Sequence, residues 1–86
     1  MTQSNNEHAM PIKVLYFASL KELFGCAGQQ LDSKGLTTVG DVWQQVSKGR
    51  EYSQTVLHSV NQEYADLDTL VKAGDEVAFF PPVTGG

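Results

Sequence analysis

The chain has 86 residues, which is the size of one small domain. Its ten acidic and six basic residues give a formal net charge of −4, and it lacks the clustered cations with which proteins bind nucleic acids or anionic membranes. The single cysteine, Cys26, excludes an intrachain disulfide and a metal site built from several thiolates, and it fits a cytoplasmic, reducing compartment.

The first ten residues are polar and show no periodicity, so residues 1–10 are interpreted as a disordered arm without the cationic and apolar regions of a secretory signal. Residues 12–18 are rich in β-branched and aromatic side chains, which predicts a strand. The longest apolar stretch, from Val14 to Ala18, is far shorter than the roughly 20 residues that span a bilayer.

A short helix is predicted after this strand. Ser19 and Glu22 have the spacing of a capping box, in which each side chain accepts a hydrogen bond from the other residue's amide. Gly25 is placed to end the helix in a left-handed conformation, close to Cys26, which is interpreted as a small residue near a turn. Residues 29–32 form a weaker strand pattern, expected to pair antiparallel with the first strand.

The main helix is the clearest element in the sequence. Thr38 is its predicted N-cap, Asp41 lies near its positive end, and Gly49 ends it. An apolar stripe follows at helical spacing: Val39, Val42, Trp43 and Val46. Trp43 is therefore predicted to lie buried between this helix and a sheet.

The second half of the chain contains shorter elements. A polar loop is expected over residues 50–55, a strand over 56–60, a turn over 61–63 and a final strand over 76–80. In the third strand, His58 has no second His, Cys or carboxylate at the spacing of metal ligands. It is interpreted as facing either solvent or a hydrogen-bond partner. A short apolar turn is expected to pack over the core through Leu67, Leu70 and Val71.

The element order is strand, short helix, strand, main helix, strand, turn and strand. One amphipathic helix with several strands predicts two layers, a mixed sheet folded around one main helix, which is an α+β class. The domain is expected to span residues 11–80, and residues 81–86 to form an extended tail.

Candidate chemical sites within the domain are few. Residues 25–28 are glycine-rich but lack the Lys and Ser/Thr of a phosphate-binding loop. The acidic residues between positions 63 and 76, with Asp66 and Asp68 as a possible acid–base pair, are interpreted as a solvated acidic face that can steer a basic partner. No metal site is predicted.

The C-terminal segment has the most specific pattern. After Phe80, the chain continues through Pro81, Pro82, Val83 and Thr84 to Gly85 and Gly86. Small residues also accumulate at frayed termini, so this composition alone leaves an incidental origin open. A glycine carboxylate, however, can pass through a narrow channel, and six residues from Pro81 reach about 20 Å. Such a carboxylate is unreactive until another enzyme activates it.

The ending from Asp75 to Gly86 resembles that of the small, sulfur-carrier subunits of molybdopterin synthase. Two further segments, residues 14–23 and 60–64, are similar to that family's first strand and helix and to its third strand and turn. The resemblance covers about residues 11–86; the N-terminal arm and residues 47–55 depart from the pattern. It implies the ubiquitin-like β-grasp fold.

The resemblance also implies a function in molybdenum cofactor biosynthesis. An ATP-dependent adenylating enzyme would activate Gly86, a sulfur donor protein would convert it to a thiocarboxylate, and the tail would enter the large subunit of molybdopterin synthase to sulfurate a pterin precursor. The chain itself would bind no cofactor and would be the non-catalytic, sulfur-donating subunit of a heterotetramer. Phe80 would anchor the interface, with the acidic residues facing basic surface.

Three alternatives stay open from the sequence. The first is a sulfur carrier for thiamine or tRNA thiolation, whose members share Gly-Gly but generally lack the preceding Phe-Pro-Pro-Val. The second is a ubiquitin-like modifier that forms isopeptide bonds to lysines. The third is a β-grasp interaction domain without chemistry of its own.

Overall fold

The computed structural model describes residues 10–82, so residues 1–9 and 83–86, which include most of the predicted arm and tail, lie outside the described part. The described elements follow in the order β1 (Ile12–Tyr16), α1 (Ser19–Phe24), β2 (Gly28–Leu31), α2 (Val39–Ser47), β3 (Leu57–Val60), β4 (Glu63–Ala65) and β5 (Glu76–Phe80).

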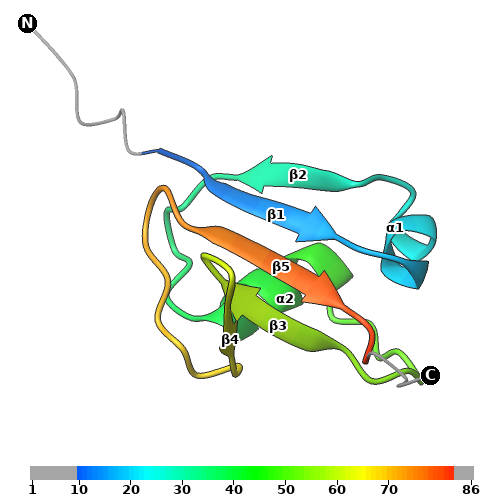
Figure 1. Cartoon of the computed structure of the whole chain (residues 1–86). Helices are drawn as coiled ribbons and strands as arrows, with labels where there is room; N and C mark the ends of the chain where they lie inside the picture. The colour runs from blue at the N-terminus through cyan, green and yellow to red at the C-terminus, as the bar shows by residue number, and fades with distance from the viewer. Residues whose placement is uncertain (1–9, 83–86) are drawn as a thin grey trace, which may run out of the picture.

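The strands form one mixed sheet in the order β2-β1-β5-β3-β4. β5 pairs parallel with β1 and antiparallel with β3, and the two outer pairs are antiparallel. α2 crosses behind the sheet and α1 lies at one end of it (Figure 1). This arrangement confirms the predicted α+β class with a mixed sheet around one main helix. Neither helix in residues 10–82 is long and apolar enough to cross a membrane.

The core lies between α2 and the face of the sheet turned toward it. Alternate residues of the two central strands are buried there, together with the helical stripe: Ile12, Val14, Tyr16, Val77, Phe79, Val39, Val42 and Val46. Trp43 packs between α2 and the sheet, as predicted, but it is half-buried rather than wholly enclosed. It lies at the edge of the stripe, where it also packs against Tyr52 of the 50–55 loop.

The start of α2 is as predicted. The amide of Asp41 donates to Thr38 Oγ1 at 3.2 Å, and the amide of Thr38 donates to Asp41 Oδ2 at 3.1 Å, which completes a capping box. Backbone hydrogen bonds from Thr37 and Thr38 hold the pKa of Asp41 below its ordinary value. The helix ends one residue earlier than expected, because Lys48 (φ 57°) rather than Gly49 takes the left-handed cap position.

The capping box predicted at Ser19 and Glu22 is wrong. Ser19 is already helical, and the preceding residue, Ala18, makes no side-chain cap. Because the amide of Phe17 still bonds to the carbonyl oxygen of Phe79 (3.1 Å), the chain must turn into the helix at Ala18 alone, with φ 55° and ψ −130°. Gly25 (φ 76°) ends α1 in the predicted left-handed conformation.

A fifth strand, β4, is missing from the sequence prediction. Val60 pairs with Glu63, so the expected turn over 61–63 is a two-residue hairpin loop in which Asn61 (φ 51°) and Gln62 (φ 72°) have positive φ. This is the geometry of a type I′ turn, whose usual signal is a glycine. With no glycine here, the sequence gives no hairpin signal.

The segment after β4 packs differently from the prediction. Leu67 and Leu70 are 47% and 71% exposed, and of the three predicted apolar residues Val71 alone is buried. Backbone hydrogen bonds hold this segment to the start of α2: Gly40 N to Leu67 O, Val39 N to Thr69 O, and Val71 N to Thr37 O, each 2.9 Å. These bonds, rather than apolar packing, position the turn.

Candidate functional site

The C-terminal tail begins at the end of the central strand β5. Phe80 is the last residue of this strand and lies opposite Leu57 of β3. Pro81 is half-buried and Pro82 is exposed. Neither proline has an amide hydrogen, so ladder pairing cannot continue beyond Phe80. The other predicted tail residues, Val83, Thr84, Gly85 and Gly86, lie outside the described residues.

Phe79 anchors the end of β5, from which the predicted tail continues. Phe79 is fully buried and contacts aromatic rings from three other elements. The ring centroids lie 5.0 Å from Trp43, 5.7 Å from His58 and 6.4 Å from Tyr16. Because side chains alternate along a strand, this anchoring turns the neighbouring Phe80 to the opposite face of the sheet.

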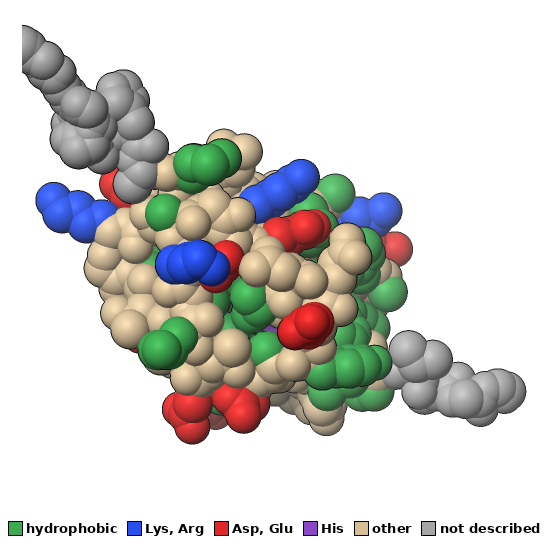
Figure 2. Space-filling model, turned by 60° about the vertical axis from the view of Figure 1, so that its left-hand side comes forward, with side chains coloured by type: hydrophobic (Ala, Val, Ile, Leu, Met, Phe, Trp, Pro, Cys, Tyr) green, Lys and Arg blue, Asp and Glu red, His purple; other side chains and the backbone are tan. Residues whose placement is uncertain are grey.

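That opposite face, which α2 does not cover, carries apolar side chains beside the tail. We call it the outer sheet face and define it by Leu15, Leu57, Tyr64, Ala78 and Phe80, whose places follow from strand register and alternation. Tyr64 is 80% exposed, and its ring centroid lies 5.9 Å from that of Phe80. Figure 2, in which this face is turned to the right, shows hydrophobic side chains gathered there.

Tyr64 is the exposed aromatic residue of this face, and the sequence analysis gave it no interface role. It lies on β4, the strand that the sequence did not predict, and pairs with Ser59. An exposed aromatic next to a second one is typical of an interface anchor. The segment 63–65 has three residues, which is too short to give a strand signal in the sequence.

The predicted acidic face is smaller than expected. Glu63, Asp66 and Asp68 are exposed, whereas Asp75 is only 5% exposed and belongs to an internal network. Asp66 Oδ1 accepts hydrogen bonds from the amide of Asp68 and from Thr69 Oγ1, so this carboxylate shapes its own turn.

Two other side chains of the described residues could in principle be reactive, those of Cys26 and His58. Cys26 is an exposed free thiol in the α1–β2 turn, as predicted. His58 is half-buried against Phe79; burial lowers its pKa, partly offset by a hydrogen bond to the Ala65 backbone and by the charge of Asp66. The ring of His58 lies against the core, so the solvent-facing interpretation of this residue is wrong. Among residues 10–82, no three His, Cys, Asp or Glu side chains form a group that could hold a metal.

The fold and the site together define a small β-grasp protein whose last strand ends at the Pro81–Pro82 step. Over residues 14–86, the chain matches the model of the ThiS family. It is 39% identical to the molybdopterin synthase sulfur carrier subunit of Haemophilus influenzae, over 87% of this chain and 99% of that protein. The chain belongs to the ThiS family.

Solved structures agree with this assignment. A putative molybdopterin converting factor, subunit 1, from Pyrococcus furiosus is 28% identical and superimposes with a TM-score of 0.74, covering 86% of this chain and 99% of that one. Small archaeal modifier protein 1 from Haloferax volcanii is 30% identical with a TM-score of 0.69, at the same coverage of both chains. The expected β-grasp fold is confirmed.

Proposed function

We propose that this protein is a sulfur carrier in molybdenum cofactor biosynthesis, which bears its sulfur as a thiocarboxylate on Gly86. The observation that carries the proposal is the segment from Phe80 to Gly86, which leaves the central strand of a ThiS-family fold. The curated relatives named molybdopterin synthase sulfur carrier subunits support the choice of pathway.

The chemistry needs no catalytic side chain of this chain. The Gly86 carboxylate attacks the α-phosphate of ATP on a separate adenylating enzyme, releasing pyrophosphate and leaving an acyl-adenylate. Sulfur at the oxidation level of sulfide, supplied by a donor protein, then attacks the acyl carbon and AMP leaves, which yields the thiocarboxylate. Its ionised sulfur attacks a carbon of the pterin precursor in the large subunit and displaces an oxygen leaving group. Water then cleaves the bond between the acyl carbon and sulfur, which leaves the sulfur on the pterin and returns Gly86 to a carboxylate. ATP is thus a substrate of the activating enzyme, and this chain itself binds no cofactor.

This chain would contribute the reach of its C-terminal sequence and a surface for docking. Pro81 and Pro82 end the ladder, and the six residues from Pro81 to Gly86 span up to about 20 Å, which suits insertion into a deep site. The outer sheet face offers the apolar surface for the large subunit, with Phe80 as one anchor and the acidic residues facing basic surface. We place the assembly, two copies of each subunit, in the cytoplasm.

Reconstitution tests this function directly. The chain is combined with the activating enzyme, ATP, a sulfur source and the large subunit, and precursor conversion is followed. Deleting Gly86 withdraws the reactive carbon by about 3.3 Å, and misplacement by even 1 Å can cost about 10²-fold in rate. We expect the same loss when residues are added after Gly86, because an amide replaces the carboxylate, and for Gly85→Val, because a β-branched side chain obstructs the channel.

All three variants should melt like the wild type, and Lys34→Ala, at an exposed position between β2 and α2, serves as the control that transfers sulfur normally. Wild-type transfer by the chain lacking Gly86 would refute the sulfur-carrier function.

A ubiquitin-like modifier is the second candidate, favoured by the similarity to small archaeal modifier protein 1. A modifier would form an isopeptide bond between Gly86 and lysines of other proteins. The intact mass of the chain from its native cell separates the two: exchange of sulfur for oxygen at Gly86 supports the carrier, and lysine conjugates support the modifier. Carriers for thiamine or tRNA thiolation would give the same mass change but would not restore precursor conversion.

A further inference from the structure

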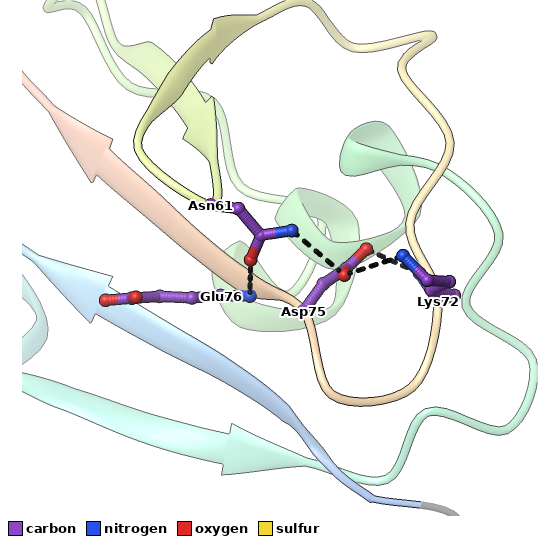
Figure 3. A network of polar contacts seen from close by, with 4 residues as sticks. All are labelled: Asn61, Lys72, Asp75 and Glu76. Carbon is purple, nitrogen blue, oxygen red and sulfur yellow. Dashed lines mark hydrogen bonds and ion pairs between the residues drawn. The ribbon is translucent and has the colours of Figure 1, made fainter.

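A small polar network joins the β3–β4 hairpin to the start of β5. Asn61 lies in the hairpin turn, where its Nδ2 donates to Asp75 Oδ1 at 3.1 Å and its Oδ1 accepts from the amide of Glu76 at 2.9 Å (Figure 3). Its own amide donates to the carbonyl oxygen of Glu76 at 2.7 Å. Asn61 thus makes three hydrogen bonds, two with Glu76, the first residue of β5, and one with the preceding Asp75.

Asp75 makes this attachment rigid. Its carboxylate is 5% exposed and also accepts hydrogen bonds from the amide of Lys72 at 2.9 Å and from Lys72 Nζ at 3.3 Å. Burial by itself raises the pKa of Asp75, but the hydrogen bonds from Asn61 and Lys72 more than offset it, so the pKa lies below its ordinary value. A buried carboxylate is stable only while such partners are present, which favours a single position of the Asn61 side chain.

The turn that Asn61 holds in place leads directly into β4, the strand at the edge of the sheet. β4 has three residues and pairs with β3 alone in the described sheet order. A strand this short has few hydrogen bonds to fix its register, so the position of its turn matters. The central residue of β4 is Tyr64, whose exposed ring packs beside Phe80 at the root of the tail.

We propose that Asn61 is a positioning residue for the docking surface formed by Tyr64 and Phe80, acting through the β3–β4 turn. This inference rests on the proposed function, because the large subunit of molybdopterin synthase is the partner that this surface receives. Asn61 touches no reacting atom; its three bonds hold β4 in the register that brings Tyr64 to Phe80.

Two glycine substitutions in the same turn form the central comparison. Asn61 and Gln62 both have positive φ, so glycine suits either position, and among residues 10–82 the structure records no side-chain hydrogen bond for Gln62. Asn61→Gly should weaken binding of the large subunit about tenfold, the loss expected when one interface anchor moves. Gln62→Gly should bind like the wild type. In nuclear magnetic resonance spectra, contacts between the Tyr64 and Phe80 rings should weaken in Asn61→Gly alone.

Asn61→Asp adds a pH-dependent readout. Its new carboxylate would face that of Asp75; the other charged groups around the turn are Glu63, Lys72 and Glu76, with Lys13 of β1 paired beside Glu76. Near pH 7.5 the two carboxylates repel, whereas a proton shared between them at lower pH restores a donor to Asp75. The affinity of Asn61→Asp relative to the wild type should therefore rise from about one tenth at pH 7.5 toward one at pH 5.

The outcomes are distinguishable. Equal affinities and equal Tyr64–Phe80 contacts in Asn61→Gly and Gln62→Gly, or a relative affinity of Asn61→Asp that does not change with pH, would overturn the positioning role. A wild-type chain that does not bind the large subunit would overturn the proposed function instead, and the Tyr64–Phe80 spectra would still decide whether Asn61 positions the pair.

Discussion

The ring of Trp43 on α2 packs against the ring of Phe79 on β5, with centroids 5.0 Å apart and ring planes inclined by 51°. The two residues are not equally buried: Phe79 is inaccessible to solvent, whereas Trp43 is half-buried. The contact joins the helix layer to the strand that carries the tail.

Phe79→Ala should therefore destabilise the fold more than Trp43→Ala. Removing a fully buried aromatic side chain costs about 3–5 kcal/mol, and a half-buried one loses about 2 kcal/mol, since part of its surface is already hydrated. Urea unfolding measures both, with Gln45→Ala on the exposed side of α2 as the unchanged control. Equal losses for the two aromatic variants would contradict this packing.

Phe80→Ala should affect binding more than folding. Its ring lies on the outer sheet face, so we expect the affinity for the large subunit to fall by about 1–2 kcal/mol, the range for an aromatic anchor. Titration calorimetry measures this loss, and Gln45→Ala on the exposed side of α2, away from the outer sheet face, is the control. Wild-type affinity in the Phe80 variant would remove this residue from the interface.

His58 should make stability depend on pH above the range where carboxylates titrate. Burial lowers its pKa in the folded state, so the unfolded chain binds more protons between that value and about 6.5. The free energy of unfolding therefore falls as the pH decreases through 6.5 toward the folded-state pKa of His58. His58→Gln should flatten this slope in urea titrations at several pH values; a slope that persists in the variant would assign it to another group.

Ala18→Gly should stabilise the protein. The φ of 55° and ψ of −130° at Ala18 are unfavourable for a residue with a β-carbon, and such strain costs of order 1–3 kcal/mol. Glycine relieves it at an entropic cost of about 0.5–1 kcal/mol, so a gain of about 1 kcal/mol is expected from thermal unfolding. Ala27→Gly, where φ is not positive, should lose stability instead. A loss at Ala18 as well would mean that this turn is not strained.

Local sequence signals predicted the elements that depend on neighbouring residues. The Thr38–Asp41 capping box, the left-handed Gly25 and the strand over 76–80 are each defined within a few positions of the chain. The same kind of signal failed at Ser19, because the hydrogen bond between Phe17 and Phe79 fixes where the chain turns.

The sequence by itself determined the fold class and the C-terminal segment, because helical spacing, strand composition and the Pro-Pro to Gly-Gly order are properties of consecutive residues. Only the tertiary structure decided that Asp75 lies buried beneath Asn61 and that Tyr64 lies beside Phe80. These pairs are brought together by the sheet order, which places β5 between β1 and β3 and adds β4 at the edge. Strand order depends on how the whole core packs, and no single stretch of the sequence encodes it.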